Sequence, residues 1–410
     1  PNPKLLEPCK FESFLCGAMV VGLAIAGYFG FGFLFHILLW FLALLQNLLC
    51  PLQWPDISLQ NKRKSDGGEQ ATVGAGHECY AYDTPGWPPY ATFKLVLSLC
   101  TGLLPFRLIS FVLVFSMIAL NVKIGCYFPP FSCGYRFCNA TFAVLSRLLC
   151  NLSSCYTVQV FHKERMKWLG QPGNHPVVVP NHITMLEAFN LEYITWGMSG
   201  CVAKSQFSIP GVKSATQFSN GVAVDTKDKE VKQKVNAGIM KFVENEPDER
   251  GRYPYARAFV IYPEGITNSQ KGLFRFNTGA FAPGMPVQSV VQRFPYTQMN
   301  PAWVSDSRVG PGNDLPWMML RYMSQFSMTL QVKVCDIWEP NEEEKVDAVL
   351  YASNVQNYMA LELGIAVTNT SNKILRQQGG PFDLKASQVH PEVESPERLS
   401  EPLLGDSSPD

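Results

Sequence analysis

The segment Pro180–Glu187 contains a histidine and a carboxylate, His182 and Glu187, at a spacing that could support proton transfer. Before it, the apolar β-branched residues 177–179 predict the end of a buried strand, and after it residues 188–196 carry apolar side chains at roughly helical spacing. His182 would therefore lie in a strand-to-helix loop, with Glu187 one turn into the helix. In α/β proteins this edge of a sheet holds the chemistry, and a histidine oriented by a carboxylate can act there as a general base.

The same residues also fit a purely structural interpretation. Thr184 and Glu187 match a capping box, in which the threonine caps the helix and the glutamate bonds back to the backbone amide of the cap. A single histidine near a strand end is, moreover, more often structural than catalytic. This segment alone does not decide between the two interpretations.

A second block of motifs further along the chain favours chemistry. Residues 259–265 read FVIYPEG, which predicts a strand over 259–262 followed by a Pro-Glu-Gly turn. Residues 279–295 read GAFAPGMPVQSVVQRFP, a glycine-rich connection that leads into a third strand over 287–293. The predicted fold class is α/β, a mixed sheet flanked by helices, with membrane-embedded helices at the N-terminus.

Taken together, these motifs resemble those of the PlsC-type glycerophospholipid acyltransferases, in the lysophosphatidylcholine and lysophosphatidylethanolamine acyltransferase branch. That branch shows Asn-His followed after four residues by Asp, then Phe-Pro-Glu-Gly-Thr, then a Gly-Ala-Phe motif that ends in Arg-Tyr-Pro. The match from Glu264 to Pro295 needs no gap, and further matches lie at 340–345 and 350–365. The resemblance covers residues 90–370.

The resemblance implies a membrane-bound enzyme that moves a fatty acyl group from acyl-CoA, its co-substrate, to the free glycerol hydroxyl of a lysophospholipid. Such a hydroxyl is a poor nucleophile until a base removes its proton, and the developing oxyanion needs stabilisation. We assign His182 as this base, and Glu187 as the residue that orients it and stabilises the imidazolium. Direct transfer requires no serine or cysteine nucleophile, and we expect no metal and no permanently bound cofactor.

Further substrate-binding residues follow from the resemblance. Asn181 belongs to the motif of His182, and the motif that helps to bind the glycerophosphate part of the acceptor is represented by Glu264, Gly265, Ile266 and Thr267. Because a carboxylate does not bind phosphate directly, we expect Glu264 to contact a hydroxyl or to hold a basic group. Lys204 lies in an Ala-Lys-Ser segment similar to a lysine-containing segment of the family, and it would either meet phosphate or be solvated.

The chain departs from the family pattern in several places. Glu187 replaces Asp and is one methylene longer, and Ile266 with Thr267 displaces the usual Thr. Thr226 stands where members often have Arg, and Asn277 stands where many have Lys. The loss of two cations would weaken phosphate binding. Two alternatives therefore stay open: a catalytically silent lipid-binding membrane protein of the same fold, and a CoA-independent phospholipid transacylase that uses the same residues.

Two apolar regions predict membrane attachment. No residue from Ser13 to Cys50 is charged, although glycines interrupt the run, and a helix needs about 20 residues to cross a bilayer. The N-terminal membrane segment, residues 1–60, would form either one span that continues into an interfacial helix or two short helices paired in one leaflet. The second apolar region, residues 93–128, would be an interfacial helix, a re-entrant helix or one arm of a membrane hairpin.

The rest of the chain divides by composition. Residues 61–92 are polar and rich in glycine and proline, which predicts a loop, and residues 129–376 would form the catalytic domain. Residues 377–410 shift to Pro, Ser and Glu without apolar periodicity, which predicts a disordered tail. With 34 basic and 34 acidic residues, the charge balance gives no indication of nucleic-acid binding. By resemblance the protein would lie in the endoplasmic reticulum membrane with its catalytic domain in the cytosol, and the sequence leaves its oligomeric state open.

Overall fold

The computed structural model describes residues 8–49, 53–54, 89–130, 132–166, 176–224, 230–243, 258–296, 300–302 and 315–368. Thr226 and the predicted tail 377–410 lie outside these residues, and so does nearly all of the predicted loop 61–92. The domain boundaries given above stay predictions.

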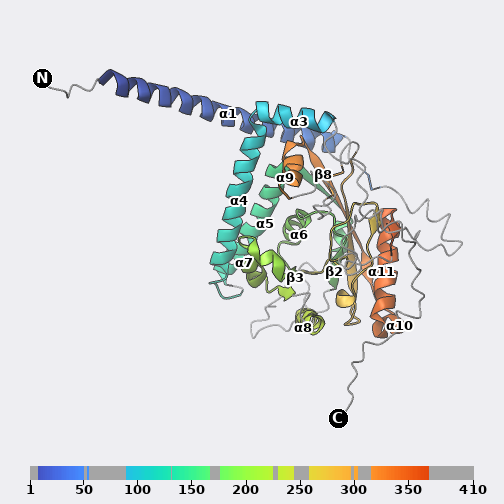
Figure 1. The fold of residues 1–410 in the computed structure, drawn as a ribbon. Helices are drawn as coiled ribbons and strands as arrows, with labels where there is room; N and C mark the ends of the chain where they lie inside the picture. The colour runs from blue at the N-terminus through green and yellow to red at the C-terminus, as the bar shows by residue number, and fades with distance from the viewer. Residues whose placement is uncertain are drawn as a thin grey trace, which may run out of the picture.

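A seven-stranded sheet organises the described part of the chain, with the strand order β1-β8-β7-β2-β5-β3-β4. β7, β2, β5, β3 and β4 run parallel, whereas β8 is antiparallel to β7 and β1 is parallel to β8. The sheet is therefore mixed, and helices flank it, which confirms the predicted α/β class (Figure 1). The strands are β1 (Tyr156–Phe161), β2 (Val177–Pro180), β3 (Met198–Ala203), β4 (Val222–Val224), β5 (Ala258–Val260), β7 (Val287–Arg293) and β8 (Met328–Trp338), and a separate parallel pair joins β6 (Gly272–Leu273) to β9 (Ala366–Val367).

The predicted strands lie where the sequence patterns put them. β7 spans the predicted residues 287–293, and β2 extends the predicted strand by Pro180. The strand predicted over 259–262 is shorter than expected, because β5 ends at Val260 and the chain then enters the Pro-Glu-Gly turn.

Helices cover both faces of the sheet, and β2 buries apolar side chains on each face. Val178 packs in one hydrophobic cluster, while Val177 and Val179 pack in the other, because successive side chains of a strand point to opposite faces. On the Val178 side lie α5 (Cys133–Ser154), α6 (Glu187–Thr195) and α9 (Leu315–Ser324), and on the other side lie α8 (Val231–Val243) and α11 (Ala348–Leu363). The short helices are η2 (Lys163–Arg165), η3 (Lys204–Ser208), α7 (Val212–Phe218), η4 (Thr278–Ala280) and α10 (Glu342–Val346).

The N-terminal apolar run forms one continuous helix, α1 (Pro8–Leu49), of 42 residues. The alternative of two short helices paired in one leaflet is therefore wrong. The second apolar region forms two helices, α3 (Pro89–Cys100) and α4 (Leu103–Gly125), joined by a tight turn. α1 and α3 lie across one end of α4 (Figure 1). Within the described residues, Met19–Leu49 and Leu103–Gly125 are long and apolar enough to cross a membrane by length and composition.

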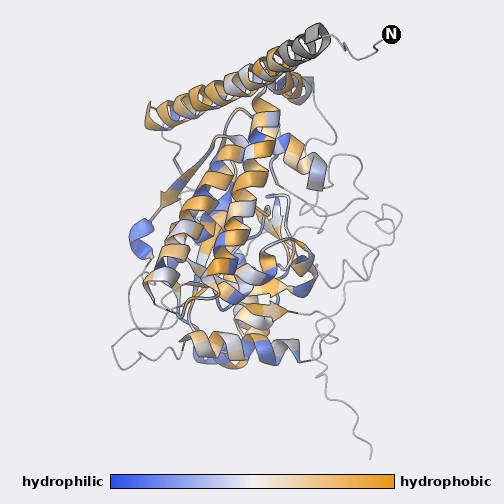
Figure 2. Ribbon diagram, turned by 90° about the vertical axis from the view of Figure 1, so that its left-hand side faces the viewer, coloured by the Kyte–Doolittle hydropathy of each residue, from blue (hydrophilic) through white to orange (hydrophobic). Residues whose placement is uncertain are grey.

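α4 and α5 form a helical layer beside the sheet. They lie next to each other and carry hydrophobic residues along most of their length (Figure 2). Between them and α7, Val114, Ile118, Val122, Leu149 and Phe218 form a third hydrophobic cluster. This cluster attaches α4, the more apolar helix, to the domain that contains the sheet.

Candidate active site

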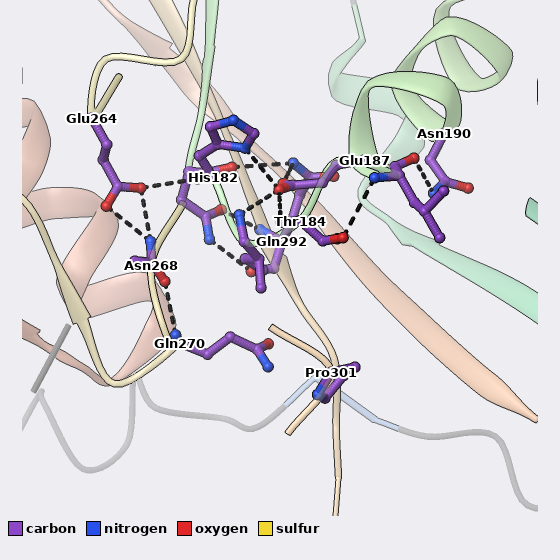
Figure 3. A network of polar contacts seen from close by, with 12 residues as sticks. His182, Thr184, Glu187, Asn190, Glu264, Asn268, Gln270, Gln292 and Pro301 are labelled. Atoms are coloured by element: carbon purple, nitrogen blue, oxygen red, sulfur yellow. Dashed lines mark hydrogen bonds and ion pairs between the residues drawn. The ribbon is translucent and has the colours of Figure 1, made fainter. Parts of the chain in front are cut away.

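The loop from β2 to α6 brings His182 and Glu187 together, as the sequence predicts. The His182 Nδ1 atom lies 2.9 Å from the Glu187 Oε1 atom. The Glu187 side chain is fully buried, whereas 23% of the His182 side chain is exposed. The carboxylate is thus shielded from water, while the imidazole reaches the surface at the carboxyl end of the parallel strands (Figure 3).

Glu187 is held by the loop that it organises. Its Oε1 atom also accepts hydrogen bonds from the backbone N–H groups of Ile183 and Thr184. Its Oε2 atom accepts a hydrogen bond from the Gln292 side-chain amide at 3.0 Å. Donors to both oxygens fix the position of the carboxylate next to the imidazole.

The capping-box interpretation is only half realised. Glu187 does bond back to the Thr184 N–H, but Thr184 is not the helix cap: the N-cap is Leu186, which makes no side-chain cap hydrogen bond. The Thr184 hydroxyl instead accepts a hydrogen bond from the Tyr322 hydroxyl at 2.9 Å. Glu187 therefore both shapes the start of α6 and contacts His182.

The loop after β5 holds His182 from the other side. The His182 N–H donates to Glu264 Oε1 at 2.9 Å, and the His182 carbonyl accepts from the Asn268 N–H at 2.7 Å. The Tyr262 ring packs against the imidazole with its centroid 4.3 Å away and an angle of 31° between the planes. These contacts join the two motif blocks that are far apart in the sequence.

Glu264 is buried, and the hydrogen bonds found for its carboxylate come from the protein itself. Both oxygens accept from the Asn268 side-chain amide, at 2.8 and 2.9 Å, and Oε2 also accepts from the Phe274 N–H at 3.0 Å. Burial raises the pKa of Glu264 to about 8, and these N–H donors act in the opposite direction. The arrangement suits a positioning role for the backbone of His182 better than direct contact with a substrate.

Asn181 is also engaged within the protein. Its side-chain amide donates to the Gln292 carbonyl at 2.9 Å and accepts from the Gln292 N–H at 2.7 Å. Asn181 is 1% exposed. This reciprocal pair continues the contact between β2 and β7 beyond their ladder, and so places Gln292 under Glu187.

The remaining predicted residues lie at the same edge of the sheet. Gly265 is exposed and has φ of 66°, a left-handed conformation that favours glycine. Ile266 is half-buried, and the buried Thr267 hydroxyl has no hydrogen-bond partner in the described part of the chain. Lys204 follows β3, which neighbours β5, and is exposed.

Asn277, which stands where many relatives have lysine, braces the turn that carries Glu264. Its backbone N–H and its side-chain amide both donate to the Pro263 carbonyl, at 2.8 and 2.9 Å. Asn277 therefore stabilises the turn by hydrogen bonds and carries no charge.

The comparisons with known proteins agree with this geometry. Residues 158–292 match the family model described as Acyltransferase. The chain is similar to this family over that segment. Human lysophosphatidylcholine acyltransferase 1 is 32% identical to it over 178 residues, which are 43% of this chain and 31% of that protein. Lysophosphatidylcholine acyltransferase of Drosophila melanogaster is 28% identical over 226 residues, 54% of this chain and 40% of that protein.

One solved structure was also matched. The crystal structure of the 1-acyl-sn-glycerophosphate acyltransferase PlsC from Thermotoga maritima has 13% sequence identity and a TM-score of 0.41, and the match covers 67% of this chain and 95% of that one. The chain spans less than half the length of the two curated relatives named above. The matches to the family model and to the lysophosphatidylcholine acyltransferases confirm the resemblance predicted from the motifs.

Sequence reasoning missed several residues of this candidate site. Gln292 and Asn268 bond to Glu187 and Glu264, and Tyr262 packs on the imidazole. The only available signal was position, since Asn268 and Tyr262 flank the Pro-Glu-Gly turn and Gln292 lies one residue before the end of the third predicted strand. Within the described residues, no cluster of three or more His, Cys, Asp or Glu side chains could hold a metal ion.

Proposed function

We propose that this acyltransferase is a membrane-bound 1-acyl-lysophospholipid O-acyltransferase. It transfers a fatty acyl chain from acyl-CoA to the free glycerol hydroxyl of a lysophospholipid, with lysophosphatidylcholine or lysophosphatidylethanolamine as the acceptor. The observation that carries the proposal is the 2.9 Å contact between His182 and a fully buried Glu187, within a segment that matches the acyltransferase family.

His182 is the proposed general base. With the proton of the imidazole on Nδ1, toward Glu187, the Nε2 atom carries a lone pair, and it makes no hydrogen bond to any residue that the structure describes. Nε2 would take the proton of the acceptor hydroxyl as its oxygen attacks the thioester carbonyl. The buried carboxylate of Glu187 would stabilise the imidazolium that forms.

The reaction then closes without a covalent enzyme intermediate. The new ester C–O bond forms, the thioester C–S bond breaks, and the imidazolium returns its proton to the departing thiolate of CoA. The base is thereby regenerated, so no permanently bound cofactor or metal is needed for the proton balance.

Substrate binding is proposed for four residues at this edge of the sheet. Gly265, Ile266, Thr267 and Lys204 surround the carboxyl ends of β5 and β3 and would contact the acceptor. Asn181 and Glu264, whose side chains bond to the protein's own backbone, would act by positioning the loop of His182. The apolar helices α1 and α4 would hold the domain at the endoplasmic reticulum membrane, with the catalytic domain on the cytosolic side.

The test uses microsomes that contain the full chain or a His182→Ala variant, labelled oleoyl-CoA and a panel of lysophospholipids. We expect the wild type to label a phospholipid and the variant to be slower by about 10² or more, the usual contribution of a general base. His162→Asn is the matched control, because His162 is exposed, has φ of 57° and has a side chain that bonds only to Glu164 among the described residues.

Other outcomes identify the alternatives. Equal inactivity of wild type and variant at equal expression would contradict the proposal and favour a silent lipid-binding protein. Acyl transfer between phospholipids in the absence of CoA would identify a transacylase.

A further inference from the structure

A pocket of 290 Å³ opens at the sheet edge beside the loop of His182. Asn181, the residue before His182, forms part of its wall, together with Gln270, Gln292, Arg293 and Ile365. Gln270 and Gln292 belong to the polar network around His182 (Figure 3). The pocket thus adjoins the candidate active site, and Arg293 is the cation that lines it.

Polar and apolar residues both line the pocket, and hydrogen bonds hold the polar residue Gln270 in place. Gln270 adopts a left-handed backbone conformation with φ of 67°, which non-glycine residues rarely adopt. Its side chain is fixed at both ends: Oε1 accepts from the Phe294 N–H at 2.6 Å, and Nε2 donates to Asn300 Oδ1 at 2.8 Å. The guanidinium of Arg293 is the charged group among the residues that line the pocket, and it carries several N–H donors.

Arg293 is held in place by contacts that leave its outer nitrogens available. Its Nε donates to Gln331 Oε1 at 2.7 Å, and its guanidinium carbon lies 4.8 Å from the centre of the Trp54 ring. In the part of the chain that the structure describes, its two Nη atoms make no hydrogen bond, and the residue forms no ion pair. A planar guanidinium fixed through Nε and one face presents the edge that binds phosphate oxygens in pairs.

Among the described residues, Lys333 is the second cation at the Trp54 ring and, unlike Arg293, it is paired with a carboxylate. Lys333 lies 5.7 Å from the centre of the same ring, and its ammonium is paired with the carboxylate of Glu362. Arg293 lacks such a partner, and partial burial lowers its pKa to about 10 with no opposing charge. Withdrawing a cation from water without a counter-ion is unfavourable, so an anion in the pocket would stabilise it.

We propose that this pocket is a phosphate subsite in which the Nη atoms of Arg293 bind a phosphate group of a substrate. The inference rests on the proposed function, because both proposed substrates carry phosphate: the lysophospholipid in its head group, and acyl-CoA in its nucleotide part. The subsite also supplies a cation to a chain that has Asn277 and Thr226 where its relatives have basic residues.

The experiment measures binding to the purified full chain in detergent, and it requires no turnover. The probes are CoA and a lysophosphatidylcholine whose free hydroxyl is methylated, titrated calorimetrically against wild type, Arg293→Gln and Arg293→Lys. We expect Arg293→Gln to raise the Kd of one probe by about 10- to 100-fold, the usual effect of losing hydrogen bonds to a charged group. Arg293→Lys should lose less, because it keeps the charge.

Two further variants isolate the pocket. Lys333→Gln removes the other cation at Trp54 and should leave both Kd values unchanged. Ile365→Glu keeps every contact of Arg293 and places a carboxylate in the wall; it should weaken the same probe as Arg293→Gln, which covers the case in which the Arg293 variants do not fold.

The outcomes separate the two proposals. Weaker binding of the lipid probe assigns the subsite to the head group, and weaker binding of CoA assigns it to the donor. Unchanged binding of both probes to Arg293→Gln, or no binding of either to the wild type, overturns the subsite. An inactive wild type whose binding depends on Arg293 would instead contradict the proposed function and support the subsite.

Discussion

At Glu187, a change of one methylene tests whether the geometry of the site matters. Glutamate reaches back from the first turn of α6 to His182, to two backbone N–H groups and to Gln292. The aspartate found at this place in the resembled branch is shorter. The carboxylate of an aspartate could not contact both the loop of His182 and Gln292 unless the loop moved.

We therefore expect Glu187→Asp to lower kcat by about 10- to 100-fold, part of what a positioned base contributes, with little effect on KM. The measurement is steady-state acylation by the full chain in microsomes. The control is Glu192→Asp, which shortens another buried carboxylate of the same helix, one that bonds to the Met198 N–H. Equal activity of Glu187→Asp and wild type would mean that the loop adapts freely.

Glu264 predicts a pH dependence of stability. Burial raises the pKa of its carboxyl from 4.5 to about 8 in the folded protein. The folded state therefore keeps a proton that the unfolded state loses, and the free energy of unfolding contributed by this group decreases as the pH rises from 4.5 to about 8. Above this pH its contribution is constant.

The measurement is urea unfolding of the full chain in detergent at pH 5 and pH 8. The wild type should lose stability between the two values, and Glu264→Gln, which cannot titrate, should lose less. If the two proteins show the same loss, the ionised carboxylate is already accommodated by its N–H donors across this range, and the pH argument is wrong.

At the scale of single elements, local sequence patterns predicted strands and the loop that holds His182, but not the contacts between strands. β2 and β7 were predictable because their β-branched runs are buried on both faces, and the loop between β2 and α6 followed from the change of hydrophobic period. The pairing of His182 with Glu187 was predictable for the same reason, since both residues belong to one short segment. Contacts across the sheet, such as that of Gln292 with Glu187, depend on strand order and could not be inferred from spacing.

The glycines of α1 explain why the alternative pair of short helices did not form. Glycine weakens a helix, so several in one run suggested a break. A Cβ added to Gly22, Gly27 or Gly30 would have no neighbouring atom within 4 Å. A Cβ added to Gly32 would come within 2.2 Å of the Gly102 carbonyl oxygen. Gly32 therefore allows α1 to cross the turn between α3 and α4 at close range. This contact between α1 and the turn could not be inferred from the sequence, and it explains a glycine that had suggested a break in the helix.

Arg107 explains how these apolar helices join the domain. Its buried guanidinium donates to the Met323 carbonyl at 2.7 Å, at the end of α9, and to His36 Nδ1 of α1 at 3.2 Å. One arginine in α4 thus connects both apolar helices to the end of α9. Arg107 is a charged residue in an otherwise apolar region, and the structure uses it as the point of attachment.

For the whole molecule, the exposed side of α4 indicates how the protein meets the membrane. Val114, Ile118 and Val122 pack against the domain, whereas the opposite side exposes large apolar residues, among them Val112 and Leu113 at 55% and 59%. Exposed apolar area of this extent on a 23-residue helix is typical of a surface that contacts lipid.

We expect this side of α4 to be covered by lipid, and a pair of cysteine variants tests the expectation. Val112 on α4 and Val349 on α11 have nearly equal exposure, 55% and 50%. In liposomes, Val112→Cys should react with a membrane-impermeant maleimide at least about tenfold more slowly than Val349→Cys, because a thiolate does not form in lipid. Mass spectrometry of the labelled peptides distinguishes these positions from the native cysteines, and detergent that displaces the bilayer should raise the rate at position 112. Equal rates in liposomes would mean that α4 faces water, in which case α1 alone would provide the membrane attachment.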